Sequence, residues 1–427
     1  MDNLQRFQPP LFPVSTGIIP EAKITCLGNN IPVYFIESGT EEIMRIEFVF
    51  KAAGQINECI PLLSTSTNMM LTEGSQNYSS EELNKKLDYY GAFLNMSAEK
   101  DSAGAVIYFL NKHISKILEL AREILFRPLF PVKELDILMK KRLRWYLVNR
   151  EKVHNLAMDQ FFESLFGSHH PYGRQVLESD FEGITPALLM DFHSKYYAPE
   201  NMAVVISGKI HEKSSDLMDS YFGDLYSHKI YIEDTENQIR GEERKKLKIM
   251  KKGSVQSAIR IGSATINKRH PDYPGLKILN TILGGYFGSR LMKNIREEKG
   301  YTYGITSAVS TLDLSGFKVI STEVGKTNTR KAIDEIYKEI RILQSQPVEE
   351  DELSVVRNYM TGELIRMFDG PFALAESFKA AWEFGLDNNY YYKLADRIKT
   401  ISSDEIIELA RTYYNIEELY EITVGEK

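Results

Sequence analysis

The sequence predicts an α+β protein made of two homologous domains, each a mostly antiparallel sheet covered by helices. Three observations support this prediction: a length of 427 residues, an alternation of strand-like and helix-like segments, and an internal repeat. A chain of this length exceeds one ordinary hydrophobic core, so two to three domains are expected. Its 43% hydrophobic and 26% charged residues are typical of a globular protein.

The strand-like segments are short, rich in β-branched and aromatic residues, and bounded by Gly or Asn. In the first half they are residues 22–28, 31–38, 44–52, 91–99, 102–110 and 201–210. Apolar residues at helical spacing predict helices over 60–90, 113–126 and, as one or two helices, 131–167. Ser79 with Glu82 three residues later predicts a capping box inside the first of these helical regions.

The second half repeats this order. In both halves a helix ends at Gly (Gly91, Gly300), two strands follow, and a further helix leads to a Pro-Val pair. Between the halves, residues 226–246 are polar, highly charged and poor in core residues, as in a linker. The predicted division is therefore a domain over 1–225, a linker over 226–246 and a domain over 247–427.

Composition argues against several classes of protein. A formal charge of −7 without a long basic block argues against nucleic acid as a partner. No run approaches the roughly 20 apolar residues of a membrane helix, and the first residues lack a secretory pattern. We therefore expect a cytoplasmic protein with no membrane partner. Cys26 and Cys59 are too few to form a metal cage alone.

Common catalytic motifs are absent from the sequence. It has no GxxxxGK[ST] phosphate loop and no G-x-S-x-G nucleophile elbow. No two of its eight histidines lie three or four residues apart, so none presents a zinc-binding pair on one helix face. His169 and His170, which precede Pro171, are interpreted as a loop pair.

One segment is specific. Residues 284–304 read GGYFGSRLMKNIREEKGYTYG, with a double Gly, a Ser-Arg-Leu helix opening, Arg296 near the helix end and Tyr303 seven residues later. This pattern resembles the second-domain signature of the pitrilysin-like metallopeptidases, which include mitochondrial processing peptidase. The resemblance covers nearly the whole chain, including the repeat. It implies a fold in which pairs of such domains close like a clam around a large chamber.

In that family the first domain bears H-x-x-E-H on a helix, where two His bind Zn²⁺ and the Glu activates the metal-bound water. Alignment on Gly74 and the following Ser places Thr65 and Met69 at the two His positions and Asn68 at the Glu position. The second metal-binding Glu falls near residues 145–146, and residues 140–149 contain no acid. The resemblance therefore implies no metal site and no zinc cofactor in this chain.

Arg296 and Tyr303, by contrast, keep the family pattern. In the family this pair is lent to a zinc site on another domain or subunit, where it bonds the substrate carbonyl and stabilises developing negative charge. The structural alternative is that Arg296 caps its own helix and Tyr303 is an ordinary strand residue. Asn95 matches the edge strand on which family members bind extended peptide, and is a candidate substrate contact.

The resemblance thus implies a zinc-less subunit that is inactive alone. It would pair with a homologous H-x-x-E-H subunit, which brings the zinc, to degrade or process peptides as a heterodimeric metalloendopeptidase. Two alternatives stay open: a non-catalytic structural or peptide-binding scaffold, and an enzyme with a different metal site. Pairing of the isolated chain with itself, as a homodimer, also stays open.

Overall fold

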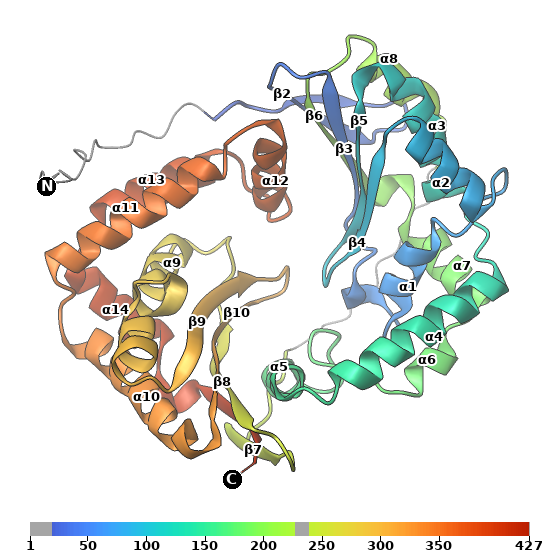
Figure 1. Ribbon diagram of the computed structural model, residues 1–427. Helices are drawn as coiled ribbons and strands as arrows, with labels where there is room; N and C mark the ends of the chain where they lie inside the picture. Colours follow the sequence, from blue (N-terminus) through green and yellow to red (C-terminus); the bar gives the residue numbers. More distant parts are fainter. Residues whose placement is uncertain (1–18, 227–238, 427) are drawn as a thin grey trace, which may run out of the picture.

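The computed structural model describes residues 19–226 and 239–426. Its strands form two sheets on opposite arms of a C-shaped molecule, with helices along the outside of the C (Figure 1). The predicted α+β class, with two sheets covered by helices, is confirmed. Among the described residues, no helix is both long enough and apolar enough to cross a lipid bilayer.

The N-terminal sheet has the strand order β1-β2-β6-β3-β5-β4. Its strands are β1 (Lys23–Cys26), β2 (Pro32–Glu37), β3 (Ile43–Phe50), β4 (Phe93–Ala98), β5 (Ala103–Leu110) and β6 (Met202–Gly208). β2 and β6 are parallel, and the other neighbouring pairs are antiparallel. β3 and β6 lie at the centre and are buried along almost their whole length.

The C-terminal sheet has the order β7-β11-β8-β10-β9. Its strands are β7 (Lys246–Met250), β8 (Gln256–Thr265), β9 (Thr302–Thr311), β10 (Gly316–Gly325) and β11 (Tyr420–Gly425). Again one pair is parallel, β7 with β11, and the others are antiparallel. This is the order of β2, β6, β3, β5 and β4, so the predicted repeat appears as one topology used twice. β1 is an additional strand of the N-terminal half.

The helices of the N-terminal half include those predicted, but the stretch 60–90 forms two separate helices and residues 180–196 add two that were not predicted. They are α1 (Leu63–Met70), α2 (Ser80–Tyr89), α3 (Ile114–Phe126), α4 (Val132–Asn149), α5 (Val153–Phe166), α6 (Asp180–Gly183), α7 (Pro186–Tyr196) and α8 (Ser214–Phe222). The capping box is confirmed, since the Ser79 hydroxyl accepts from the Glu82 backbone N–H and the Glu82 carboxylate accepts from that of Ser79. The predicted stretch 131–167 forms two helices, α4 and α5.

The C-terminal half has matching helices. They are α9 (Tyr273–Asn280), the π-helical η4 (Thr281–Gly285) and η5 (Met292–Glu298), α10 (Thr329–Ser345), α11 (Glu350–Arg366), α12 (Pro371–Trp382), α13 (Asn389–Thr400) and α14 (Ser403–Tyr413). Gly91 and Gly300 end equivalent helical segments, with φ of 61° and 63°. A Cβ would meet nothing within 4 Å at either position, so the left-handed backbone itself explains the glycine.

Each half lends one helix to the sheet of the other half. α5 follows α4 in the N-terminal half but packs against β8 and β11 of the C-terminal sheet. There its Phe161 and Leu165 enter a core that includes Val319 and Ile422. This exchange places apolar side chains of one half in the core of the other.

α12, the counterpart of α5, makes the reciprocal contact with β2 and β6. Trp382 Nε1 donates a hydrogen bond to the Tyr34 hydroxyl at 2.8 Å, and the Phe378 ring lies 5.0 Å from the Tyr34 ring. The two halves also meet at their hairpin turns, where the Asp313 backbone N–H donates to Asp101 Oδ2 at 2.9 Å. These contacts hold the two sheets in one arrangement.

The predicted linker lies partly outside the described residues, since 227–238 belong to the part that is not described. Its described end contacts α5, where the Glu242 backbone N–H donates to the Ser164 carbonyl at 2.8 Å. Its last residue, Lys246, already begins β7. The division into 1–225, 226–246 and 247–427 stays a prediction.

We predict that Phe161→Ala lowers the free energy of unfolding by about 3–5 kcal/mol, because Phe161 is 0% exposed and its removal leaves a cavity between α5 and the C-terminal sheet. Urea denaturation followed by fluorescence measures this loss. Tyr89→Ala is the control, since Tyr89 is 82% exposed and its loss should be close to neutral. Equal effects of the two substitutions would contradict the exchanged-helix core.

Candidate functional site

Helix α1 carries residues 65–69, which align with the metal motif, and packs against β4, β5 and α7. Asn68 is 1% exposed. Its Nδ2 donates hydrogen bonds to the Gly104 carbonyl of β5 and to the Tyr197 hydroxyl after α7, both at 3.0 Å. Burial raises the pKa of Tyr197, so this hydroxyl stays neutral. Asn68 therefore ties α1 to the sheet and to α7.

An arginine from α4 occupies the other side of the motif. Arg142 Nη2 donates to Thr65 Oγ1 at 2.7 Å, and Arg142 Nη1 donates to Ser66 Oγ at 2.6 Å. Ser66 is completely buried, whereas Met69 is 44% exposed. The guanidinium thus bridges α1 and α4 with two parallel hydrogen bonds, a geometry for which its planar fork is suited.

Tyr146, one of the two residues aligned with the second metal-binding Glu, also makes structural contacts. The Tyr146 hydroxyl donates to the Val176 carbonyl at 2.9 Å, and its ring lies 5.2 Å from the Phe181 ring. Tyr146 lies one helical turn after Arg142 on the same face of α4. Tyr146 thus packs against the segment before α7, and Arg142 is the α4 residue that contacts the motif.

These donors do not fit Zn²⁺, which binds imidazole, thiolate and carboxylate groups. Thr65 already accepts from a guanidinium, which would repel a dication, and Asn68 uses its amide hydrogens on protein oxygens. Across residues 19–226 and 239–426, no group of three or more His, Cys, Asp or Glu side chains is placed to hold a metal ion.

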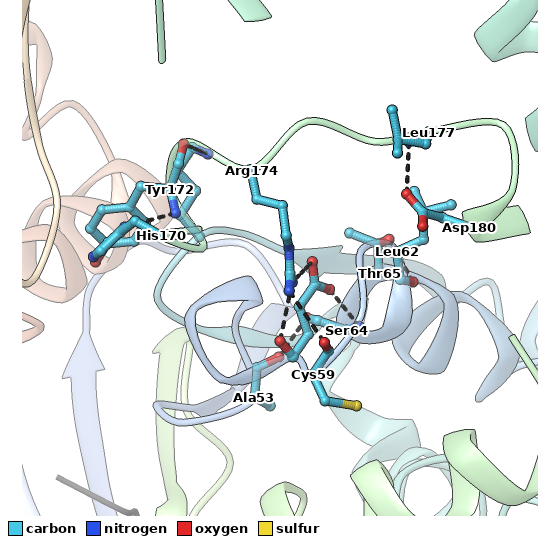
Figure 2. A network of polar contacts seen from close by, with 12 residues as sticks. Ala53, Cys59, Leu62, Ser64, Thr65, His170, Tyr172, Arg174, Leu177 and Asp180 are labelled. Atoms are coloured by element: carbon cyan, nitrogen blue, oxygen red, sulfur yellow. Dashed lines mark hydrogen bonds and ion pairs between the residues drawn. The ribbon is translucent and has the colours of Figure 1, made fainter. Parts of the chain in front are cut away.

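A network of polar contacts around Arg174 and an acid lies at the start of α1 (Figure 2). Glu58 Oε2 accepts from the Ser64 backbone N–H at 3.0 Å, and Arg174 Nη2 lies 3.5 Å from Glu58 Oε1. Arg174 also donates to the backbone carbonyls of Glu58 and Cys59. Burial raises the pKa of Glu58 to about 7, although the Ser64 N–H, Arg174 and Arg142 act in the opposite direction.

Arg296 and Tyr303 lie in the C-terminal half, on η5 and at the second position of β9. Tyr303 is 93% exposed. Arg296 Cζ lies 4.6 Å from the centre of the Phe287 ring, in a cation–π contact, and Phe287 is itself 64% exposed. Because β9 is the last strand of its sheet, this group of side chains lies at an open sheet edge.

Asn95 is exposed on β4, the last strand of the N-terminal sheet, opposite Val106 of β5. The structure therefore places Asn95 beside the motif helix, since α1 contacts β4. It places Tyr303 on β9, the counterpart of β4, and Arg296 on η5, which precedes Gly300 as α2 precedes Gly91. Within the described part of the chain, no hydrogen bond or ion pair joins either residue to α1 or β4.

Sequence reasoning missed Arg142, Arg174 and Glu58. The sequence could have indicated Arg142, because this residue lies four positions before Tyr146, where the family has its second metal-binding Glu. Residues four apart share one face of a helix. No local pattern marks Glu58, whose side chain is only 7% exposed because distant elements cover it.

A comparison with protein families matches residues 183–360 to the model described as "Peptidase M16 inactive domain". Among curated proteins, an uncharacterized zinc protease, YmxG, from Bacillus subtilis is 22% identical over 69% of this chain and 72% of its own length. Residues 183–360 of this chain are therefore similar to the M16 inactive domain. The segment predicted to resemble that family lies inside the matched region.

Further curated proteins and a solved structure are similar to this chain. The "Non-peptidase homolog YmxG" of Helicobacter pylori is 20% identical over 93% of this chain and 92% of its own length. The alignment with a Mycobacterium bovis zinc protease spans 57% of that protein. Among solved structures, a peptidase M16 inactive domain from Pseudomonas fluorescens superimposes with a TM-score of 0.83 at 20% identity, covering 95% of this chain and 98% of its own.

We predict that Arg142→Met lowers the free energy of unfolding by about 1–3 kcal/mol, because the bridge between α1 and α4 is lost. Arg142→Lys should recover only part of this loss, since an ammonium group lacks the fork that reaches both hydroxyls. Arg144→Met, at an exposed position of the same helix, is the control in thermal and urea denaturation. If both Met variants unfold alike, Arg142 does not bridge the helices.

Glu58 gives a prediction for pH. Its folded pKa of about 7 lies above the ordinary 4.5, so the folded state binds more protons between these values. Stability of the wild type should therefore fall as pH rises from 4.5 through 7, by about 1–3 kcal/mol relative to Glu58→Gln. Urea denaturation of both proteins at pH 5 and pH 8 measures this difference. Parallel profiles of the two proteins would contradict it.

Proposed function

We propose that this chain is the zinc-less subunit of a two-subunit M16 peptidase. On this proposal it is inactive alone, holds no zinc, and pairs with a homologous chain that carries H-x-x-E-H and the metal. The observation that carries the proposal is the contrast between the two halves. Thr65 and Asn68 of the motif make structural hydrogen bonds, whereas Tyr303 is 93% exposed, with the Arg296 guanidinium on the neighbouring element.

The partner's zinc would supply the Lewis acid and the activated water. The residues of this chain would act on the substrate. The Tyr303 hydroxyl donates a hydrogen bond to the carbonyl oxygen of the scissile peptide, and the Arg296 cation stabilises the negative charge that develops there. Asn95 and the edge of β4 hold an extended peptide, because backbone pairing at a sheet edge tolerates many side chains.

Reconstitution examines this proposal directly. The purified chain, a purified homologous chain with H-x-x-E-H from the same organism, and their mixture are assayed with a quenched fluorescent peptide. Only the mixture should be active, with a complex of both chains seen by size-exclusion chromatography. Zinc should be found in the purified H-x-x-E-H chain and in the mixture, and not in this chain alone.

In that mixture, Arg296→Ala and Tyr303→Phe should each lower kcat by about 10²–10³-fold, because each removes one group that stabilises the transition state. Lys293→Ala, exposed on the same π-helix, is the matched control and should leave kcat unchanged. If the H-x-x-E-H chain is fully active alone, or if both variants leave the mixture unchanged, the proposal fails.

A second candidate is a non-catalytic structural or peptide-binding scaffold. Two observations favour it: the motif helix is fastened by Asn68 and Arg142, and the H. pylori relative is named a non-peptidase homolog. A scaffold would bind its partner or peptide without raising the rate of cleavage. Binding of the two chains with no peptidase activity in the mixture would select this candidate over the first.

For the location of the protein we propose the cytoplasm, because free, exposed thiols such as those of Cys26 and Cys59 suit a reducing compartment. Fractionation of cells that produce the untagged chain, with immunoblotting of cytoplasmic and extracytoplasmic fractions, measures this. The zinc-bearing partner should appear in the same fraction, since the two must meet to form the enzyme.

A further inference from the structure

The two halves differ at one edge of their sheets. In the N-terminal half the outer edge of β2 is covered, because β1 pairs with it in antiparallel register from Lys23 opposite Phe35 to Cys26 opposite Pro32. The counterpart of β2 is β7, which ends the C-terminal sheet. No described strand pairs with the outer edge of β7, so its outward backbone groups are available to another strand.

The pairing register shows which backbone groups are free. The Glu421 N–H of β11 donates to the Lys245 carbonyl, and the Lys251 N–H donates to the Gly425 carbonyl. In a parallel pair alternate residues face the neighbouring strand, so Lys246, Lys248 and Met250 direct their N–H and C=O groups outward. One of these carbonyls, that of Lys246, accepts from Arg244 Nε at 3.0 Å.

Beside this edge lies a basic hollow of about 400 Å³. Cations from three places converge on it: the approach to β7, β7 itself, and the start of α10. They are Arg244, Lys246, Lys248, Lys326 and Arg330. Two of them have acidic neighbours, as Lys326 lies 3.9 Å from Glu426 and Arg330 lies 3.1 Å from Asp334.

The other three cations, Arg244, Lys246 and Lys248, have no carboxylate within 4.0 Å among the residues that the structure describes. One acid, Glu421, lines the hollow, but it is only 9% exposed. Hydroxyl groups of Thr327, Thr329 and Thr423 complete the lining. The N-terminus of α10 opens here without an acidic residue in its first turn, which adds positive potential.

We propose that the edge of β7 is a docking site for an acidic, extended segment of another protein. The segment pairs as an added strand with the outward groups of Lys248 and Met250, as β1 does on β2. Side chains of an added strand alternate between the two faces of the sheet, so every second residue points over the hollow. Carboxylates at those positions meet the cations, which selects an acidic strand and repels a second copy of β7.

Lysines on an edge strand also have a protective role, since they discourage aggregation. For that protective role, charged residues on the edge strand itself are sufficient. Here Lys326 comes from the short turn before α10, Arg330 from the first turn of α10, and Arg244 from the residues before β7. The charge therefore surrounds a hollow and does not only follow a strand. Convergence from separate elements is what a ligand site requires.

Fluorescence anisotropy with the full chain tests the site. The probe is a fluorescein-labelled decapeptide of alternating Glu and Val, compared with the same pattern of Lys and Val and with alternating Glu and Pro. We expect binding of the Glu-Val peptide only, weakening as salt rises. Lys246→Glu with Lys248→Glu should weaken it at least about tenfold, whereas Lys140→Glu with Lys141→Glu, an exposed pair on α4, should not.

Hydrogen exchange of the wild type provides a second measurement that needs no variant. The Glu-Val peptide should slow exchange of the Lys248 and Met250 amides, which an added strand would bond. Three outcomes would overturn the proposal: no binding of the Glu-Val peptide, equal binding of the Glu-Pro peptide without amide protection, or binding of phosphatidylglycerol vesicles through the same lysines in place of the peptide.

Discussion

The exchange of α5 and α12 between the halves is the constraint on which the rest of the molecule depends. Each helix buries its apolar face on the sheet of the other half, so separating the sheets would expose both faces at once. Because hydrophobic stabilisation scales with buried apolar area, this reciprocal packing resists movement of one half against the other. The positions of α1, β4, η5 and β9 relative to one another follow from it.

A second consequence concerns the motif helix. A metal site that joins two helices contributes to stability as well as to chemistry. In this chain the join between α1 and α4 is made by one guanidinium and two hydroxyls, and Asn68 fastens the opposite side of α1. The positive charge between α1 and α4 is therefore the Arg142 guanidinium. Unlike a metal ion, it is part of the chain and needs no acidic ligand. The fold can therefore keep α1 in place without H-x-x-E-H.

Local sequence signals predicted most of the elements. Alternation, capping and the left-handed glycines act over a few residues, so the strands, the capping box of α2 and the turns at Gly91 and Gly300 follow from the sequence. The packing of α5 against the C-terminal sheet could not be predicted in this way. The apolar face of α5 shows that the helix is buried, but it does not show which element covers it. The roles of Arg142 and Glu58 depend on residues far away in sequence, and the charges that surround them arise only on folding.

Internal symmetry also makes the differences between the halves informative. Two sheets with the same strand order should have the same exposed edges, yet β2 is covered by β1 and β7 has no such cover within residues 239–426. An uncovered edge is a liability that proteins reduce with charge, and β7 carries that charge. If protection were its only purpose, the cations would follow the strand and face water. Instead, Lys326 and Arg330, which lie just before and in the first turn of α10, line one hollow together with Lys246 and Lys248. Such an arrangement lowers the free energy of an acidic strand at this edge and raises that of a basic one, which is how a sheet edge becomes selective.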